Sequence, residues 1–178
     1  MTTPGMQPLG GETVFEGSQF SVRIERIRHL GPDGEDDVVE RETVRRVDAA
    51  AIVAYDAEHV WLVRQPREAI LQVTLEIPAG KLDEGESPLQ SARRELAEEI
   101  GREADEWQEI QTYYPSSGYS DEAVHLFAAT GLSDSDTEAD PGERIEIVAW
   151  PLADIDAAIA ATNDAKTLIG LQWLRSTL

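Results

Sequence analysis

The stretch at residues 80–101, GKLDEGESPLQSARRELAEEIG, carries the strongest local signals in the chain. Ser87 is a favourable N-cap residue, Pro88 suits the first helical position, and Gln90 can complete a capping box. Gly101 can adopt the left-handed conformation that commonly ends a helix. The stretch therefore predicts a loop followed by a helix that runs from Pro88 to the residue before Gly101.

The predicted helix has two different faces. At 100° per residue its apolar side chains fall in one narrow stripe, formed by Leu89, Ala92, Leu96 and Ile100. Three glutamates cluster on the adjoining flank, namely Glu95, Glu98 and Glu99. Like charges at this spacing cost an isolated helix only about 0.2–0.5 kcal/mol per pair, so the crowding alone does not prove a metal site.

The order of residues in this stretch resembles the Nudix box. The matching positions are, in order, Gly80, Glu86, Arg94-Glu95-Leu96, Glu98-Glu99 and Gly101, with gaps of five, seven, one and one residues. This pattern is far more specific than a lone glycine-rich loop. Arg102 stands where the family usually has an aliphatic residue, a difference that concerns packing and no metal ligand.

A diphosphate presents clustered negative charge, so water attacks phosphorus readily only when divalent cations neutralise and orient the oxygens. Mg²⁺ prefers carboxylate oxygens, and Mn²⁺ is an alternative. The resemblance implies that Glu95 and Glu99 are metal ligands and that Glu98 binds or steadies the metal cluster. It also implies that the carbonyl of Ala79 adds an oxygen, and that Arg94 orients the carboxylates. An ordinary helix ion pair would explain Arg94 equally well.

Composition limits the other classes of function. The chain has 178 residues, 41% of them apolar, which fits one globular domain with a full core. It contains no cysteine, so disulfides, thiolate catalysis and cysteine zinc sites are excluded. A formal net charge of -20 disfavours nucleic-acid polymers and anionic membranes as partners. With no signal-like or membrane-spanning stretch in the sequence, we expect a cytoplasmic protein.

We expect a disordered N-terminus at residues 1–14, a β extension at 15–47 and a Nudix hydrolase domain at 48–178. Strands are predicted at 20–27, 38–47, 49–55, 59–64, 73–77, 107–114, 123–129 and 144–150. Two further helices are predicted at 154–161 and 164–176. The pattern favours an α/β fold, an α/β/α sandwich around a mixed sheet, as the Nudix resemblance also implies.

Segments outside the box resemble ADP-ribose pyrophosphatases. They are RETVRR at 41–46, RQPR at 64–67, LEIPAG at 75–80, the loop YPSSGYSDE at 114–122 and the closing helix at 168–174. In the loop, Ser117 stands where that subfamily usually has proline. The resemblance implies hydrolysis of ADP-ribose to AMP and ribose 5-phosphate. Alternatives are another nucleoside diphosphate sugar, such as ADP-glucose or GDP-mannose, a nucleoside triphosphate, and a non-catalytic nucleotide sensor.

The same resemblance points to residues that bind the substrate. Arg67 is expected to hold a phosphate, because a guanidinium can bind phosphate oxygens through two parallel hydrogen bonds. Arg41 is a second candidate, although Arg45 and Arg46 fit the same role. The loop contributes Gly118 and Glu122, and Glu122 is equally compatible with a surface position. Phe20 could stack on adenine or belong to the core.

The acidic loop SDSDTEADPG at 133–142 precedes Glu143. The resemblance implies that a glutamate from this loop positions or deprotonates the attacking water, with Glu143 the best match and Glu138 and Asp140 as alternatives. The β extension has too little apolar surface to fold alone. We therefore expect a homodimer in which this extension contributes to the partner's site.

Overall fold

The computed structural model describes residues 5–31, 36–137 and 144–178. The chain divides into two compact units. Unit 1 comprises Met1–Val47 and Tyr114–Glu122, and unit 2 comprises Asp48–Tyr113 and Ala123–Leu178. Among the described residues, no helix combines the length and the apolar character that crossing a membrane requires.

Unit 1 is built on a three-stranded antiparallel sheet in the order β1-β2-β3. Its strands are β1 (Met6–Glu16), β2 (Ser21–Leu30) and β3 (Asp36–Arg45). The loop segment of unit 1 attaches to β3, because the backbone N–H of Val44 donates to the carbonyl of Tyr119 over 2.7 Å. Arg45 also binds the carboxylate of Asp121 at 2.8 Å.

The expected disorder over residues 1–14 is wrong from Met6 onward. β1 pairs with β2 along most of its length, although every one of its residues is exposed. Its backbone hydrogen bonds therefore hold the strand in place without a buried side chain. Proline and glycine in this segment coincide with an irregular register between Pro8 and Gly11, as is common at bulges of edge strands.

Unit 2 contains a seven-stranded mixed sheet with the central order β10-β5-β4-β9-β8, while β6 pairs with β5 and β7 pairs with β4. Its strands are β4 (Ala49–Tyr55), β5 (His59–Arg67), β6 (Gln72–Glu76), β7 (Ala79–Lys81), β8 (Arg102–Tyr113), β9 (Val124–Asp134) and β10 (Glu146–Pro151). The β4–β9 pair is parallel and the other pairs are antiparallel.

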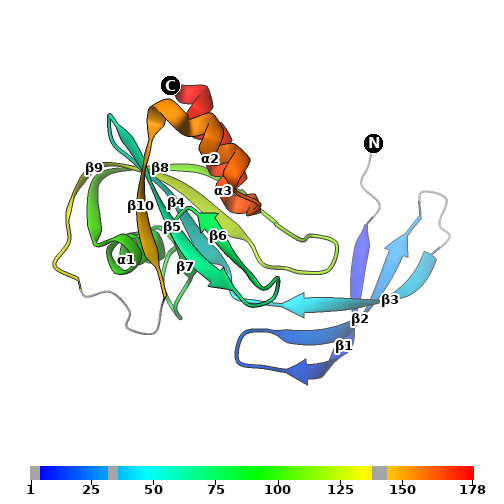
Figure 1. The fold of residues 1–178 in the computed structure, drawn as a ribbon. Coiled ribbons are helices and arrows are strands. Elements are labelled where there is room, and N and C mark those ends of the chain that lie inside the picture. Colours follow the sequence, from blue (N-terminus) through cyan, green and yellow to red (C-terminus); the bar gives the residue numbers. More distant parts are fainter. Residues whose placement is uncertain (1–4, 32–35, 138–143) are drawn as a thin grey trace. The chain divides into compact units, whose positions relative to one another are not determined.

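Helices cover both faces of this sheet, as Figure 1 shows. Helix α1 (Pro88–Ile100) packs on one face, and α2 (Ile155–Ala161) and α3 (Ala165–Thr177), which follow the short 3₁₀ helix η1 (Leu152–Asp154), pack on the other. Alternate side chains of the central strand β4 enter opposite cores, as expected for a strand buried on both faces. The predicted α/β/α sandwich around a mixed sheet is thus confirmed.

Helix α1 has the predicted bounds because its ends are specified locally. The Ser87 hydroxyl accepts from the backbone N–H of Gln90, and the Gln90 side chain accepts from the backbone N–H of Ser87. Pro88 occupies the first turn, and Gly101 ends the helix at φ 63°. These caps fix the register that places Glu95 against Gly80 and Glu99 against Ala79, both in β7.

Candidate active site

Arg94 is the centre of an ion-pair network on α1. Its Nε and Nη2 atoms each donate to a different oxygen of Glu86, both over 3.0 Å. Its Nη1 atom donates to Glu95 at 2.6 Å and to Glu98 at 3.0 Å. Nη2 also donates to the carbonyl of Lys81 at 2.9 Å, which links the helix to β7. One guanidinium thus holds three box carboxylates and the backbone at the end of β7.

The charges in this network stabilise one another. Hydrogen bonds from Arg94, and then from the backbone N–H of Asp83, hold the pKa of Glu86 below its usual value. The hydrogen bonds to Glu86, followed by the contacts with Glu95 and Glu98, raise the pKa of Arg94 above its already high value, although partial burial opposes this. The predicted role of Arg94, to orient carboxylates, agrees with these contacts.

Glu95 lies directly against the backbone of Gly80. A Cβ atom at position 80 would lie 1.9 Å from the Glu95 Cδ atom, so only glycine leaves room for this carboxylate. Glu95 and Glu99 are both buried. Glu99 accepts a hydrogen bond from the backbone N–H of Ala79 over 2.9 Å. Residues 79 and 80 therefore fix the positions of two carboxylates that the sequence predicts as metal ligands.

These donors fit a hard divalent cation, because Glu95, Glu98 and Glu99 offer carboxylate oxygens from nearby positions of one helix. Burying acidic side chains is costly unless they are paired or bind a cation. Within the described ranges, no three acidic or histidine side chains already form a group arranged to hold a metal. In this structure Arg94 binds Glu95 and Glu98, and these residues would hold the metal together with Glu99 and the Ala79 carbonyl.

A second ion-pair cluster surrounds Glu76 at the end of β6. Glu76 is 1% exposed and accepts from Arg67 through both oxygens, at 2.6 Å from Nε and 2.5 Å from Nη2. It also accepts from Lys166 on α3 and from the Thr74 hydroxyl. Burial alone would raise the pKa of Glu76, but the bonds from Arg67, Lys166 and Thr74 outweigh it and lower the pKa to about 2.

The sequence pointed to Arg67 as a candidate but not to its partner Glu76 or to Lys166, which also donates to Glu76. The pKa of Arg67 is raised, first by its hydrogen bonds to Glu76, and the negative charges of Asp164 and Glu99 add to this effect. The charge on Arg67 is therefore stabilised by the candidate metal ligand Glu99 as well as by its direct partner Glu76. Two signals were available in the sequence. Glu76 is an acidic residue within the apolar segment just before Pro78, and Lys166 is one of only two lysines in the chain.

The remaining predicted residues lie in unit 1 or outside the described part of the chain. Arg41 on β3 donates to the carbonyl of Glu40 at 2.9 Å. Glu122 faces Arg46, with 3.3 Å between a carboxylate oxygen and Nε. A Cβ atom added at Gly118 would meet no heavy atom within 4 Å, so the surroundings of this glycine are open. Glu143, with the alternatives Glu138 and Asp140, lies outside the described residues.

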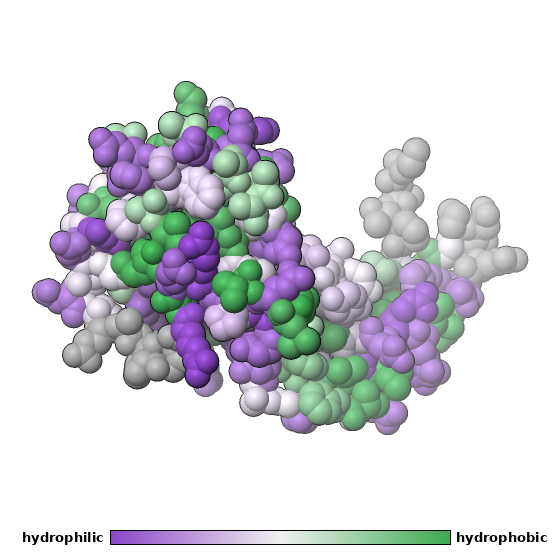
Figure 2. Space-filling view, viewed as in Figure 1, coloured by the Kyte–Doolittle hydropathy of each residue, from purple (hydrophilic) through white to green (hydrophobic). Residues whose placement is uncertain are grey.

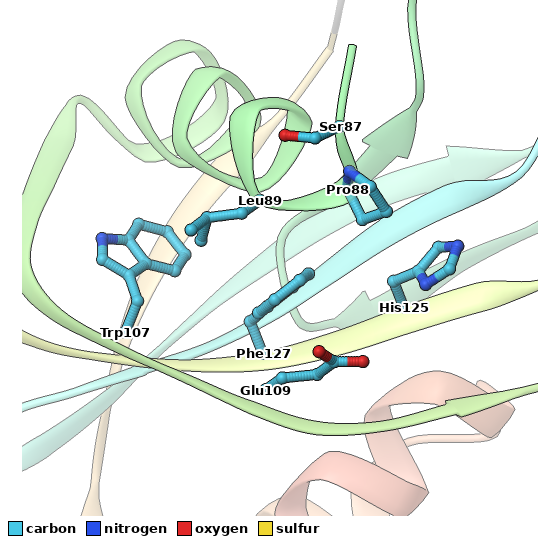
Figure 3. A pocket seen from close by; sticks show the side chains of 7 residues that line it. All are labelled: Ser87, Pro88, Leu89, Trp107, Glu109, His125 and Phe127. Atoms are coloured by element: carbon cyan, nitrogen blue, oxygen red, sulfur yellow. The ribbon is translucent and has the colours of Figure 1, made fainter.

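A separate cavity of about 280 Å³ lies between the start of α1 and strands β8 and β9. Figure 3 shows Leu89, Trp107 and Phe127 around this space. Its other lining residues are Ser87, Pro88, Glu109 and His125. The His125 ring shares a 2.9 Å hydrogen bond with the Thr112 hydroxyl. None of the predicted site residues lines this cavity, so it is distinct from the two ion-pair clusters.

Comparisons with known proteins agree with the box on α1. The family model of the NUDIX domain matches residues 45–171. The chain is 34% identical to an ADP-ribose pyrophosphatase of Bacillus subtilis (strain 168), covering 94% of this chain and 91% of the relative. It is 32% identical to a methanol dehydrogenase activator of Bacillus methanolicus, covering 92% and 89%.

A solved structure of an ADP compounds hydrolase superposes with a TM-score of 0.82 at 26% identity. The alignment covers 100% of this chain and 96% of that structure. Both units of the chain therefore lie within the aligned length. Nudix ADP-ribose pyrophosphatases use divalent metal ions, in agreement with the oxygen donors on α1. The chain belongs to the Nudix family.

Proposed function

We propose that this protein hydrolyses the diphosphate bond of ADP-ribose, with Mg²⁺ as cofactor, and releases AMP and ribose 5-phosphate. The observation that carries the proposal is the carboxylate cluster on α1, which Arg94 gathers and Gly80 accommodates. Relatives named ADP-ribose pyrophosphatase, at 30–37% identity, support the choice of substrate. ADP-glucose and GDP-mannose are the nearest alternative substrates.

Each part of the site has a separate task. Glu95, Glu99 and the Ala79 carbonyl would hold Mg²⁺, or Mn²⁺ in its place, and Glu98 would bind or steady it. When bound, the cation neutralises the diphosphate oxygens and makes phosphorus more open to attack by water. Arg94 keeps the glutamates oriented through its hydrogen bonds. Glu143 is the proposed group that positions or deprotonates the water.

Arg67 of unit 2 is the residue that we assign to a substrate phosphate, and Arg41, Gly118 and Glu122 of unit 1 stay candidates from the resemblance to ADP-ribose pyrophosphatases. Arg67 is 41% exposed, so its guanidinium remains accessible although it is paired with Glu76. A fixed arginine can bind a phosphate more tightly than a mobile one, because less side-chain entropy is lost. This property supports Arg67 as the residue that binds a substrate phosphate.

The test is a panel of initial rates with ADP-ribose, ADP-glucose, GDP-mannose and a nucleoside triphosphate, each with Mg²⁺, with Mn²⁺ and with a chelator. We expect ADP-ribose to give the highest kcat/KM and activity to disappear with the chelator. A higher kcat/KM for another compound would replace the substrate assignment. Tight binding of ADP-ribose without turnover under every condition would indicate a nucleotide sensor instead.

The proposed assembly is a homodimer formed through unit 1. None of the described residues of unit 1 is buried, and both clusters of buried apolar side chains belong to unit 2. Unit 1 also exposes large apolar side chains, including Met6, Phe15 and Val38, and Figure 2 shows apolar residues gathered on its visible face. A small sheet without a core needs a partner surface.

Sedimentation velocity tests this assembly. The intact chain is expected to sediment at twice its 19.6 kDa mass. A variant lacking residues 1–40 is expected to be monomeric and to bind ADP-ribose weakly. An intact chain that stays monomeric at micromolar concentration, or a monomeric truncation with unchanged KM, would contradict the homodimer.

A further inference from the structure

We propose that Glu76 is a positioning residue that fixes the guanidinium of Arg67 for a phosphate group of the substrate. The inference rests on the proposed function, in which Arg67 binds a phosphate of a nucleoside diphosphate sugar. It adds a residue from β6 that touches neither substrate nor metal. Its action on the substrate passes through Arg67 alone.

The first observation is that Glu76 occupies one edge of the Arg67 guanidinium and leaves the opposite edge open. Nε and Nη2 of Arg67 donate to the two oxygens of Glu76, at 2.6 Å and 2.5 Å. Within the described part of the chain, Nη1 of Arg67 donates to no other residue. The guanidinium is planar and rigid, so fixing one edge also fixes the direction of the remaining N–H groups. Those groups are available to a phosphate.

The second observation is the difference in burial between the two partners. The Glu76 side chain is 1% exposed, whereas that of Arg67 is 41% exposed. The carboxylate therefore lies inside the protein, and the guanidinium lies at its surface. A buried carboxylate has few alternative conformations, so Glu76 can keep the exposed guanidinium of Arg67 in one orientation.

The third observation is that Glu76 is itself held in place. Lys166 and Thr74 also donate to it, and Lys166 pairs with Asp164 at 3.1 Å. A buried ion pair generally adds little net stability compared with apolar residues of the same size. Stability alone is therefore a weak reason for placing four charged side chains here. Orientation of the exposed Arg67 gives the buried Glu76 a specific role.

A double-mutant cycle separates positioning from a purely structural ion pair. We would measure kcat and KM for ADP-ribose in the intact protein, in Glu76→Gln, in Arg67→Ala and in the double variant. A lost hydrogen bond to a charged group predicts a rise in KM of about tenfold or more for Glu76→Gln, with kcat nearly unchanged. In the Arg67→Ala background, Glu76→Gln is expected to leave KM as it is.

Two further variants keep the test decisive if Glu76→Gln folds poorly. Lys166→Met removes one of the groups that hold Glu76 but keeps both hydrogen bonds between Glu76 and Arg67, so it should lower Tm and raise KM by clearly less than Glu76→Gln does. Arg67→Lys keeps the charge and loses the fork, so its KM should rise as in Arg67→Ala. The proposal is overturned if Lys166→Met raises KM as much as Glu76→Gln does. It is equally overturned if Arg67→Lys has the KM of the intact protein, or if the effects of Glu76→Gln and Arg67→Ala on KM multiply.

Calorimetric binding of ADP-ribose in the presence of a chelator distinguishes failure of this inference from failure of the proposed function. If the intact protein binds ADP-ribose but never hydrolyses it, the hydrolase assignment is wrong, and the same cycle measured by Kd still decides the role of Glu76. If the protein hydrolyses ADP-ribose and KM is insensitive to Glu76→Gln, only the positioning role is wrong. Absence of both binding and hydrolysis overturns both proposals.

Discussion

Replacing Gly80 with alanine should damage catalysis far more than folding. The new Cβ atom would lie 1.9 Å from Cδ of Glu95 and within 2.2 Å of both carboxylate oxygens. Ordinary contact begins near 3.4 Å, so the carboxylate has to move by more than an ångström. Such a displacement would break the 2.6 Å hydrogen bond from Arg94 to Glu95. A misplacement of about 1 Å can cost about 10²-fold in rate.

The cost to stability should be smaller, because the atoms in the way belong to the end of a flexible side chain. Overpacking of this kind typically costs about 1–3 kcal/mol. The assay is kcat for ADP-ribose at saturating Mg²⁺, together with the free energy of unfolding from urea titration. We expect kcat to fall about 10²-fold or more, while the protein remains folded.

Gly170→Ala is the matched control. Its Cβ atom would lie 2.8 Å from Val53 Cγ2 and 3.2 Å from Ile77 Cδ1, in the core and away from the α1 carboxylates. This variant should change the free energy of unfolding and leave kcat within a few-fold of the original. A Gly80→Ala protein with the original kcat, or a Gly170→Ala protein that loses as much activity, would refute the role assigned to the Gly80–Glu95 contact.

Three further predictions concern stability. Ser87→Ala removes the N-cap of α1 and should lower the free energy of unfolding by about 1 kcal/mol, measured by urea titration. Because the folded pKa of Glu76, about 2, lies below its ordinary 4.5, its contribution is complete above pH 4.5 and is lost as pH falls toward 2. The stability advantage over Glu76→Gln should therefore shrink by about 3 kcal/mol across that window, and a pH-independent difference would contradict this. If the net charge of -20 reflects adaptation to salt, Tm should rise with KCl, because the screening length falls from about 30 Å at 0.01 M to about 3 Å at 1 M. A Tm that does not change with KCl concentration would instead indicate an acidic protein without adaptation to salt.

The sequence predicted the features that local chemistry specifies. Helix α1 has its predicted bounds because Ser87, Gln90 and Gly101 act within one or two turns. Strand β7 was missed because its three residues, Ala79–Lys81, form a strand only through pairing with β4. Strand β1 was missed for a related reason, since its proline and two glycines indicate disorder and its order comes from hydrogen bonds to β2.

The candidate site shows the same difference between contacts that are local in the sequence and contacts that depend on the packing of distant elements. Arg94 could be assigned because its partners Glu95 and Glu98 lie within four positions and Glu86 within eight. The cluster around Glu76 could not be assigned in this way. Lys166 is 90 positions away from Glu76 in the sequence, and the two side chains meet only because α3 packs on the sheet. The assignment of Glu143 remains a prediction, because that residue lies outside the described part of the chain. Long-range packing thus determined what the sequence alone did not reveal.

The most direct test of the proposed activity is the rate of AMP formation from ADP-ribose by the intact protein and by Glu99→Gln. The substitution keeps the size of the side chain and removes a carboxylate charge that the cation needs. We predict AMP and ribose 5-phosphate in equal amounts from the intact protein with Mg²⁺, and a rate lowered by about 10² or more in the variant. Failure of the intact protein to release AMP, or an unchanged rate in Glu99→Gln, would contradict the proposed metal-dependent hydrolysis.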